Sequence, residues 1–318
     1  MPDTAQLRGR RPVIEVRRFA GPEVHRRQLD HLRVVQLTDL HFGRVTPLRI
    51  QREAVALTNA ARPDLVVMTG DFVCHSQAYL DQLTEVLGGL EAPTVGVLGN
   101  HDYWSGAAGV TRALDRAGVA LLRNAHTTVT LRRQRLQIVG VDDAYTGHAD
   151  VAAATKGLRR DLPVLGLSHI AEEADRLWTQ GVPLVLSGHT HAGQVTVAGL
   201  HELSLGRVAG HKYVHGLYGR RAGGGRSDRG GAVYVGAGIG ASVMPFRIGE
   251  RGRREITVFE LGAAIGDFPE HHPEQVALPG RPPSDRKRAK RAEKVLRRRA
   301  RRVRAHRTTS GSSARDAS

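Results

Sequence analysis

The sequence predicts an α/β protein, an α+β-like four-layer sandwich in which two packed mixed β-sheets are flanked by helices. Short apolar runs rich in Val, Leu and Ile recur from about residue 32 and alternate with helical stretches, which is typical of βαβ units. Further along, apolar runs follow one another without helices between them, which indicates antiparallel strands. Glycine is plentiful, at 37 residues, whereas aromatic residues make up only 4%, and this balance suits a fold with many tight turns.

The first group of strands alternates with helices. Its apolar runs predict strands at residues 32–37, 64–68, 93–98, 163–167 and 183–186. Helical stretches fit between them at residues 47–61, 76–90, 106–117 and 170–180. The later runs predict antiparallel strands at residues 127–131, 136–141, 194–197, 232–235 and 255–261. Every strand of the first group is followed by polar residues, which are therefore expected at one edge of a sheet.

Three regions are expected along the chain. Residues 1–30 form an N-terminal extension with an edge strand, residues 31–265 form one domain, and residues 266–318 form a tail that is Pro-rich and then basic. A hydrophobic content of 40% over 318 residues is enough for the core of one large domain. The Gly/Arg/Ser-rich stretch 219–231 is expected to be a surface loop.

The positive charge belongs mainly to the tail. Residues 281–318 hold 15 Lys and Arg against 3 Asp and Glu, so +12 of the net charge of +16 lies there. Such a segment is expected to attract an anionic membrane surface or a nucleic acid, the alternative being a disordered solubilising extension.

Cys74 is the only cysteine, which excludes an intrachain disulfide and a Cys-based zinc site, and no disulfide-linked partner is expected. No stretch of about 18 apolar residues exists, and the N-terminus is polar and Arg-rich. We therefore expect a cytoplasmic protein, with peripheral membrane association as the further role of the tail.

Seven nitrogen or oxygen donors stand just after predicted strands. They are Asp39, His41, Asp71, Asn100, His169, His189 and His191. A hydrolytic site with two metals needs six to eight such donors and at least one bridging carboxylate, and this set meets that need. Residues spaced i, i+2 on extended chain point to the same side, so each Asp-x-His or His-x-His pair can converge on one cavity. Gly70, Gly99 and Gly188 precede these donors, where the backbone must turn sharply.

These motifs and their order resemble the calcineurin-like metallophosphoesterases. The resemblance is carried by Asp39-Leu40-His41, Gly70-Asp71, Gly99-Asn100-His101-Asp102, His169 and Gly188-His189-Thr190-His191. It extends through Val141-Asp142-Asp143, Gly193-Gln194 and the segment 234–245, and so covers about residues 30 to 262. That wider pattern is similar to a bacterial phosphodiesterase subgroup that includes UDP-2,3-diacylglucosamine pyrophosphatase-like enzymes.

The resemblance implies a fold of two mixed sheets flanked by helices and a dinuclear metal centre at the strand carboxyl ends. By matching motif, it implies that Asp39, His41 and His191 bind one divalent metal ion. Asn100, His169 and His189 would bind the second, and Asp71 would bridge the two. The ions could be Mn, Fe or Zn, because this ligand set does not select one. Two such cations activate a shared water for in-line attack on phosphorus.

His101 is implied to be the catalytic residue that contacts the phosphate and protonates the leaving oxygen. Many relatives carry a second carboxylate three residues after the bridging Asp, where it orients this histidine, but here that position is Cys74. The partner of His101 could then be Asp102, another carboxylate such as Asp142 or Asp143, or no residue at all. The pair Cys74-His75 also replaces the arginine expected of a protein phosphatase.

Three further residues are candidates for contact with substrate. Arg44 follows the first motif and could clamp a phosphate oxygen, although solvated arginines are common in this chain. Tyr103 and Trp104 follow the Asn100 loop and could wall the cleft, although aromatic residues at such junctions also serve packing. The other histidines are expected to be surface or structural, with His211 and His215 the two nearest to substrate.

The sequence therefore predicts a divalent-metal-dependent hydrolase of phosphodiester or pyrophosphate bonds. Two alternatives stay open: a nuclease that uses the basic tail for affinity, and a non-catalytic scaffold of the same fold. A scaffold would be expected to lack donors, and none of the seven is missing.

Overall fold

In the computed structural model, the described residues are 13–193, 209–222, 230–241, 247, 249 and 252–280. The expected strand at 194–197, most of the expected loop at 219–231 and the whole basic segment 281–318 lie outside them. Along the described chain, no helix is both long enough and apolar enough to cross a membrane.

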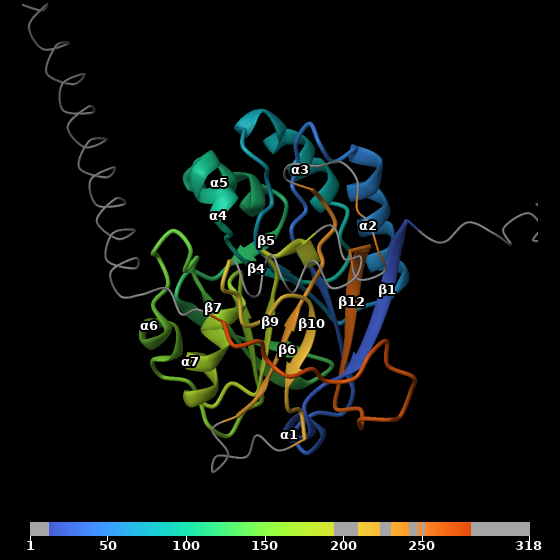
Figure 1. Ribbon diagram of the computed structural model, residues 1–318, viewed down its shortest axis with the longest axis vertical. Helices are drawn as coiled ribbons and strands as arrows, with labels where there is room; N and C mark the ends of the chain where they lie inside the picture. Colours follow the sequence, from blue (N-terminus) through green and yellow to red (C-terminus); the bar gives the residue numbers. More distant parts are fainter. Residues whose placement is uncertain are drawn as a thin grey trace, which may run out of the picture.

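Two six-stranded mixed sheets form the centre of the molecule, which confirms the predicted fold class (Figure 1). The first sheet has the order β1-β12-β2-β3-β4-β5. Its strands are β1 (Ile14–Ala20), β12 (Arg254–Leu261), β2 (Leu32–Leu37), β3 (Leu65–Thr69), β4 (Thr94–Val97) and β5 (Val119–Leu121). The second sheet has the order β10-β11-β9-β8-β7-β6. Its strands are β10 (Gly216–Gly219), β11 (Ala232–Val235), β9 (Leu184–Ser187), β8 (Val164–Ser168), β7 (Gln134–Val141) and β6 (Ala125–Leu131).

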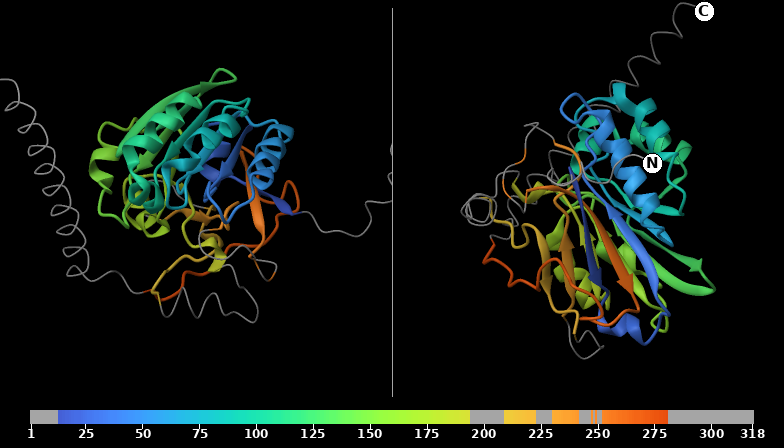
Figure 2. Two further views of the ribbon diagram at one scale, coloured as in Figure 1. Left: turned by 90° about the horizontal axis from the view of Figure 1, so that it is seen from above. Right: turned by 90° about the vertical axis from the view of Figure 1, so that its right-hand side faces the viewer.

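Helices cover the outer face of each sheet (Figures 1 and 2). On the first sheet they are α2 (Leu48–Ala60), α3 (Leu80–Leu87), α4 (Asn100–Ser105) and α5 (Ala107–Arg116). On the second sheet they are α6 (Val151–Thr155) and α7 (Ala174–Thr179). The remaining helical elements are α1 (Glu23–Arg26) and the short 3-10 turns η1 (Gln77–Tyr79), η2 (Ala171–Glu173) and η3 (His191–Gly193).

The two faces of the first sheet belong to different hydrophobic cores. In β2, Val34 packs against the second sheet, whereas Val35 and Leu37 pack under the helices. This follows from the period-2 geometry of a strand, and it explains why the buried strands read as continuous apolar runs. Each fully buried Val or Leu side chain stabilises the fold by about 1.5–3 kcal/mol through the hydrophobic effect.

Three of the later strands were expected to be antiparallel, and that expectation is only partly right. β7 pairs antiparallel with β6 but parallel with β8, and β11 pairs antiparallel with β10 but parallel with β9. β12 likewise pairs antiparallel with β2 and parallel with β1. The parallel pairs require crossover connections, and α6 lies on the crossover from β7 to β8.

The chain after β12 remains in contact with the domain up to residue 280. Arg221 forms ion pairs with Glu270 and Glu274, and Gln275 donates to the backbone oxygen of His215 at 2.9 Å. The sequence assigned residues 266–280 to the tail, and in the structure these contacts hold part of that stretch against β10.

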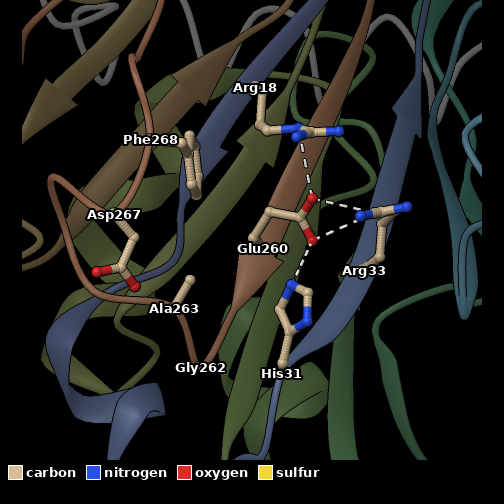
Figure 3. A pocket seen from close by; sticks show the side chains of 8 residues that line it. All are labelled: Arg18, His31, Arg33, Glu260, Gly262, Ala263, Asp267 and Phe268. Atoms are coloured by element: carbon tan, nitrogen blue, oxygen red, sulfur yellow. Dashed lines mark hydrogen bonds and ion pairs between the residues drawn. The ribbon is translucent and has the colours of Figure 1, made fainter.

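A pocket of about 400 Å³ lies at the amino end of β2, the end opposite to Asp39 (Figure 3). Its wall is built by Glu260, which is buried and accepts from His31 at 2.7 Å and from Arg33 at 3.0 Å. Arg18 forms a further ion pair with Glu260 at 3.4 Å. These contacts of the Glu260 side chain link β1, β12 and β2 at this end of the first sheet.

Candidate metal centre

The carboxyl ends of five parallel strands bring all seven predicted donors to one region between the sheets. In the first sheet, Asp39 and His41 follow β2, Asp71 follows β3, and Asn100 begins α4 just after β4. In the second sheet, His169 follows β8 directly, and His189 and His191 follow β9. Because the sheets pack face to face, these loops meet at one edge of the sandwich.

Asp39, His41 and His191 form the first donor group, and all three are buried. The Nε2 atoms of His41 and His191 are 2.9 Å apart, and Asp39 Oδ1 lies 3.4 Å from His191 Nε2 and 3.8 Å from His41 Nε2. The three ligand atoms therefore face one point.

Asp71, His169 and His189 form the second group. Nε2 of His169 lies 3.3 Å from His189 Nδ1, 3.3 Å from Asp71 Oδ2 and 3.2 Å from the amide oxygen of Asn100. Four predicted donors thus converge here as well.

Asp71 lies between the two groups. Its Oδ2 is 3.3 Å from His169 Nε2 in the second group and 3.6 Å from His41 Nε2 in the first. One carboxylate oxygen therefore contacts both groups, as a bridging ligand must.

The backbone is strained at five of these seven donors. Asp39, His41, Asp71, His189 and His191 have φ angles between +43° and +76°, in the left-handed region that residues with a Cβ rarely adopt. Such residues cost on the order of 1–3 kcal/mol each and are found where the surrounding structure holds them in place. Five of the eleven non-Gly residues with positive φ in the described structure are thus donors of this site.

Two glycines leave room for the donors. A Cβ on Gly99 would collide with the Asp71 carboxylate, and a Cβ on Gly188 would collide with Thr38 Oγ1 and Asp39 Oδ2. Both close approaches agree with the role that the sequence predicts for these glycines.

The buried charges require positive partners. Although burial opposes it, the imidazoles of His169 and His41 hold the pKa of Asp71 well below its usual range. Burial lowers the pKa of His169, but Asp71 outweighs this effect and raises it to about 10. Burial and the Asp71 carboxylate raise the pKa of Asp39 to about 6. Two carboxylates in one buried cluster need cationic charge, which protons or metal ions could supply.

The donor set fits divalent metal ions. Metal–ligand distances of about 2.0–2.2 Å place neighbouring ligand atoms roughly 3.0–3.4 Å apart, close to the separations in both groups. His169 Nδ1 donates to the backbone oxygen of Thr69 at 2.7 Å, which leaves Nε2 as the lone-pair donor that faces Asp71. Asp, His and Asn are borderline ligands that suit Mn, Fe or Zn.

His101 lies at the edge of the cluster, with Nε2 4.0 Å from Asp71 Oδ2. Its Nδ1 lies 2.6 Å from the backbone oxygen of Cys74, so this carbonyl, rather than a carboxylate, orients the ring. Burial lowers the pKa of His101, although Asp71 and the Cys74 carbonyl oppose this.

None of the three carboxylates that the sequence offered as partners contacts His101 through a hydrogen bond in the described structure. Asp142 accepts from Tyr103 and Arg123, and Asp143 accepts from the backbone of Thr146. These two carboxylates are engaged with their own loop and with α4.

Asp102 instead holds the loop that carries Asp71. Its carboxylate accepts four backbone N–H groups, from Gly99, Asp71, Phe72 and Val73, at 2.8–3.2 Å. Burial and Asp71 raise the pKa of Asp102, and these donors oppose that shift. Because the donors fill both oxygens and leave no acceptor for a carboxyl proton, we take Asp102 to be ionised.

The three candidate substrate contacts lie in different places. Trp104 is at the rim, 48% exposed, with its ring centroid 4.8 Å from that of His101. Tyr103 points away, since its hydroxyl donates to Asp142 at 2.6 Å and its ring stacks on His148 at 3.9 Å. Arg44 is exposed on the loop after His41.

Other residues near the cluster were not predicted. His75 stacks flat on His101, with ring centroids 4.5 Å apart, and the ring of Tyr145 lies 5.3 Å from that of His189. A nitrogen of Arg247 lies 3.1 Å from His191 Nδ1. Of the two histidines expected nearest to substrate, His211 lies 5.5 Å from the His189 ring, whereas His215 is buried against Arg17 and Glu255. Of these residues, only His75 follows a predicted donor closely in the sequence. Its place near the cluster is therefore the one that could have been expected from the sequence.

Comparison with known proteins identifies the family. The model of the calcineurin-like phosphoesterase family matches residues 32–193. A transmembrane protein with a metallophosphoesterase domain from Danio rerio is 32% identical over 74% of this chain, which spans only 54% of that protein. Phosphodiesterase YaeI of Escherichia coli is 30% identical over 72% of this chain and 82% of its own length. The metallophosphoesterase YkuE of Bacillus subtilis is 29% identical, covering 73% and 79%.

The matched residues 32–193 include all seven donors, from Asp39 to His191. Together with the two-sheet fold, this match shows that the chain belongs to the calcineurin-like phosphoesterase family.

Proposed function

We propose that this calcineurin-like phosphoesterase hydrolyses phosphodiester or pyrophosphate bonds with the help of two divalent metal ions. The observation that carries the proposal is the position of Asp71, whose Oδ2 contacts imidazoles of both donor groups. A carboxylate shared between two sets of converging donors is what a dinuclear centre needs.

Each ion would have its own ligands. Asp39, His41 and His191 would hold the first, and Asn100, His169 and His189 would hold the second, with Asp71 shared. When bound, such a pair of ions, of Mn, Fe or Zn, activates water and neutralises phosphate oxygens.

His101 would act on the leaving group. Since its Nδ1 hydrogen is held by the Cys74 carbonyl, Nε2 is the atom that can carry a proton to a leaving oxygen. This Nε2 faces the Asp71 side of the cluster, where a bridging phosphate would lie.

Two observations favour diesters and pyrophosphates over phosphoproteins. YaeI of Escherichia coli, a bacterial relative that matches this chain over 82% of its own length, is named a phosphodiesterase. The loop after Asp71 carries Cys74 and His75 in place of the arginine expected of a protein phosphatase.

The proposal is tested with a panel of monoesters, diesters and pyrophosphates, including a diacylated nucleotide-sugar pyrophosphate. The metal-reconstituted protein is compared with Asp71→Asn and with Asp161→Asn, which alters a fully exposed carboxylate paired only with Arg159 among the residues described. We expect chelation and Asp71→Asn to abolish turnover and Asp161→Asn to leave it unchanged.

Three outcomes would change the assignment. Turnover that survives both chelation and Asp71→Asn would refute the metal mechanism. Hydrolysis of polynucleotides alone, with a steep dependence on salt, would assign a nuclease. Metal binding without turnover of any ester would assign a scaffold.

A further inference from the structure

Aromatic and imidazole rings form a rim beside His101. We define this rim as His75, Trp104 and Tyr145, which come from the loop after β3, from α4 and from the loop after β7. The Trp104 centroid lies 4.8 Å from His101, 6.4 Å from His75 and 5.9 Å from Tyr145. Three separate segments thus place rings around one exposed indole.

The rim spans the distance between His101 and the second donor group. Tyr145 contacts Trp104 on one side and the ring of His189 on the other, at 5.3 Å and a tilt of 45°. A group that leaves phosphorus toward His101 would therefore pass over these rings.

Trp104 is an exposed hydrophobic side chain that lies beside the donor groups. Five large hydrophobic residues are exposed among the residues described: Val13, Val16, Trp104, Ile265 and Val276. Of these, only Trp104 contacts the rings of the cluster. Trp104 therefore presents an apolar surface to solvent directly beside His101, where a substrate group can reach it.

The shape of the rim favours a ring over an acyl chain. An acyl chain is held by a continuous apolar surface, whereas the neighbours of the Trp104 ring are the rings of His75, His101 and Tyr145, each of which carries polar atoms. Stacking on an aromatic face suits planar groups whatever their sequence or substituent.

We propose that this rim binds a planar aromatic ring in the leaving group of the substrate, so that the preferred substrates are diesters of an aryl alcohol or a nucleoside. The inference rests on the proposed function. In the reaction the water oxygen bonds to phosphorus and gives one proton to the solvent, while the bond from phosphorus to the leaving oxygen breaks. That oxygen takes a proton from His101 Nε2, and His101 regains a proton from the solvent. The ring stays on Trp104 while this bond breaks.

Kinetics with matched leaving groups test the inference. Phenyl methyl phosphate and hexafluoroisopropyl methyl phosphate have leaving alcohols of similar acidity, but only the first is planar. We expect Trp104→Ala to lower kcat/KM about tenfold for the phenyl ester, mainly through KM, and less than about twofold for the fluoroalkyl ester. Trp104→Phe should restore most of the loss. Equal losses for both esters would overturn the inference while leaving the proposed function intact.

Binding provides a readout that does not depend on turnover. Trp104 and Trp178 are the only tryptophans of the chain. Trp178 lies in α7 and packs on Tyr213. The variant Trp178→Phe therefore leaves Trp104 as the only source of indole fluorescence. We expect methyl 4-nitrobenzylphosphonate, in which CH₂ replaces the scissile oxygen, to quench its emission. If Trp178→Phe does not fold, the difference in quenching between the native chain and Trp104→Phe gives the same information.

Competition then separates stacking from general hydrophobic binding. Methyl benzylphosphonate should displace the nitro compound at a concentration about tenfold lower than methyl cyclohexylmethylphosphonate, which is similar in size but not planar. Equal or reversed affinities, or no quenching at all, would overturn the inference whether or not the protein turns over any ester. A nucleoside analogue in the same assay distinguishes nucleoside from aryl leaving groups.

Discussion

His101 is oriented by the backbone of Cys74: its Nδ1 lies 2.6 Å from the carbonyl oxygen of that residue. A carbonyl is supplied by any residue at position 74, so the side chain there can change without loss of this contact. In this chain a backbone carbonyl thus orients His101, as the carboxylate at the position of Cys74 is expected to do in many relatives.

We therefore expect Cys74→Ala to retain kcat for a diester within about threefold, whereas His101→Asn should lower it by about 10²- to 10⁴-fold, the usual contribution of general acid catalysis. Steady-state kinetics of the two metal-reconstituted variants measure this difference.

The thiol of Cys74 lies within 4.8 Å of nitrogens of His41 and His101, so metal content must be measured in the same samples. Loss of metal from Cys74→Ala would mean that the sulfur is a ligand, and the carbonyl would then not explain tolerance at this position.

The two donor groups should lose metal separately. His191→Ala removes a ligand of the first group only, and His189→Ala one of the second only, so each variant should retain about one ion per chain after gel filtration. Asp71→Asn should lose both, because Asp71 contacts both groups. Elemental analysis of the purified proteins checks this, and equal loss from all three variants would contradict two separable sites.

The convergence of these seven side chains could be predicted from the sequence, because the edge of a parallel sheet collects whatever follows its strands. Asp39, Asp71 and His169 each stand one or two residues beyond the end of a buried apolar run, so locating the run locates the donor. The short helix α4 was not predicted, because six residues beginning at Asn100 carry no helical periodicity.

Tertiary contacts were beyond prediction for a different reason. The Cys74 carbonyl is a group that all residues share, so no sequence pattern marks it. Likewise, Tyr103 and Trp104 are neighbours in α4, yet the hydroxyl of Tyr103 bonds to Asp142 while Trp104 faces His101. Their different directions follow from the helical turn and from a partner 39 residues away.

Backbone strain at the site makes a prediction about stability. At His191, φ is +52°, where glycine is favoured over alanine by about 1 kcal/mol. In metal-free protein, His191→Gly should therefore be more stable than His191→Ala by about that amount, as measured by urea unfolding.

His169 is the matched control, because its φ is not positive. There the order should reverse, with glycine less stable than alanine by roughly 0.5–1 kcal/mol. If alanine were the more stable replacement at both positions, the left-handed conformation of His191 would carry no strain.

The basic segment 281–318 should act independently of the metal centre. We expect its deletion to leave kcat for a small diester unchanged and to abolish sedimentation with anionic vesicles at low salt, because each basic residue near such a surface contributes about 1 kcal/mol before screening. Vesicle binding that is unaffected by the deletion would remove this role, and binding to polynucleotide in its place would identify nucleic acid as the partner.

A buried histidine outside the two donor groups is expected to make the stability depend on pH. His25 in α1 is fully buried, and its Nε2 donates to the backbone oxygen of Val164 at 3.0 Å, while Nδ1 has no hydrogen-bond partner among the described residues. Burial lowers its pKa to about 4, although the bond to Val164 opposes this, so the folded protein holds His25 neutral.

Because the pKa of His25 in the unfolded chain is about 6.5, the unfolded state binds more protons between pH 6.5 and 4, and stability is lost as pH falls through this range. The loss from this one group approaches about 3 kcal/mol and is complete below pH 4. His25→Gln cannot titrate, so the difference in unfolding free energy between pH 7 and 5 should be about 2 kcal/mol smaller in the variant than in the native chain. Urea unfolding is measured with chelator present, so that metal release does not contribute. Equal pH dependence of the two proteins would mean that the pKa of His25 is not lowered in the folded state.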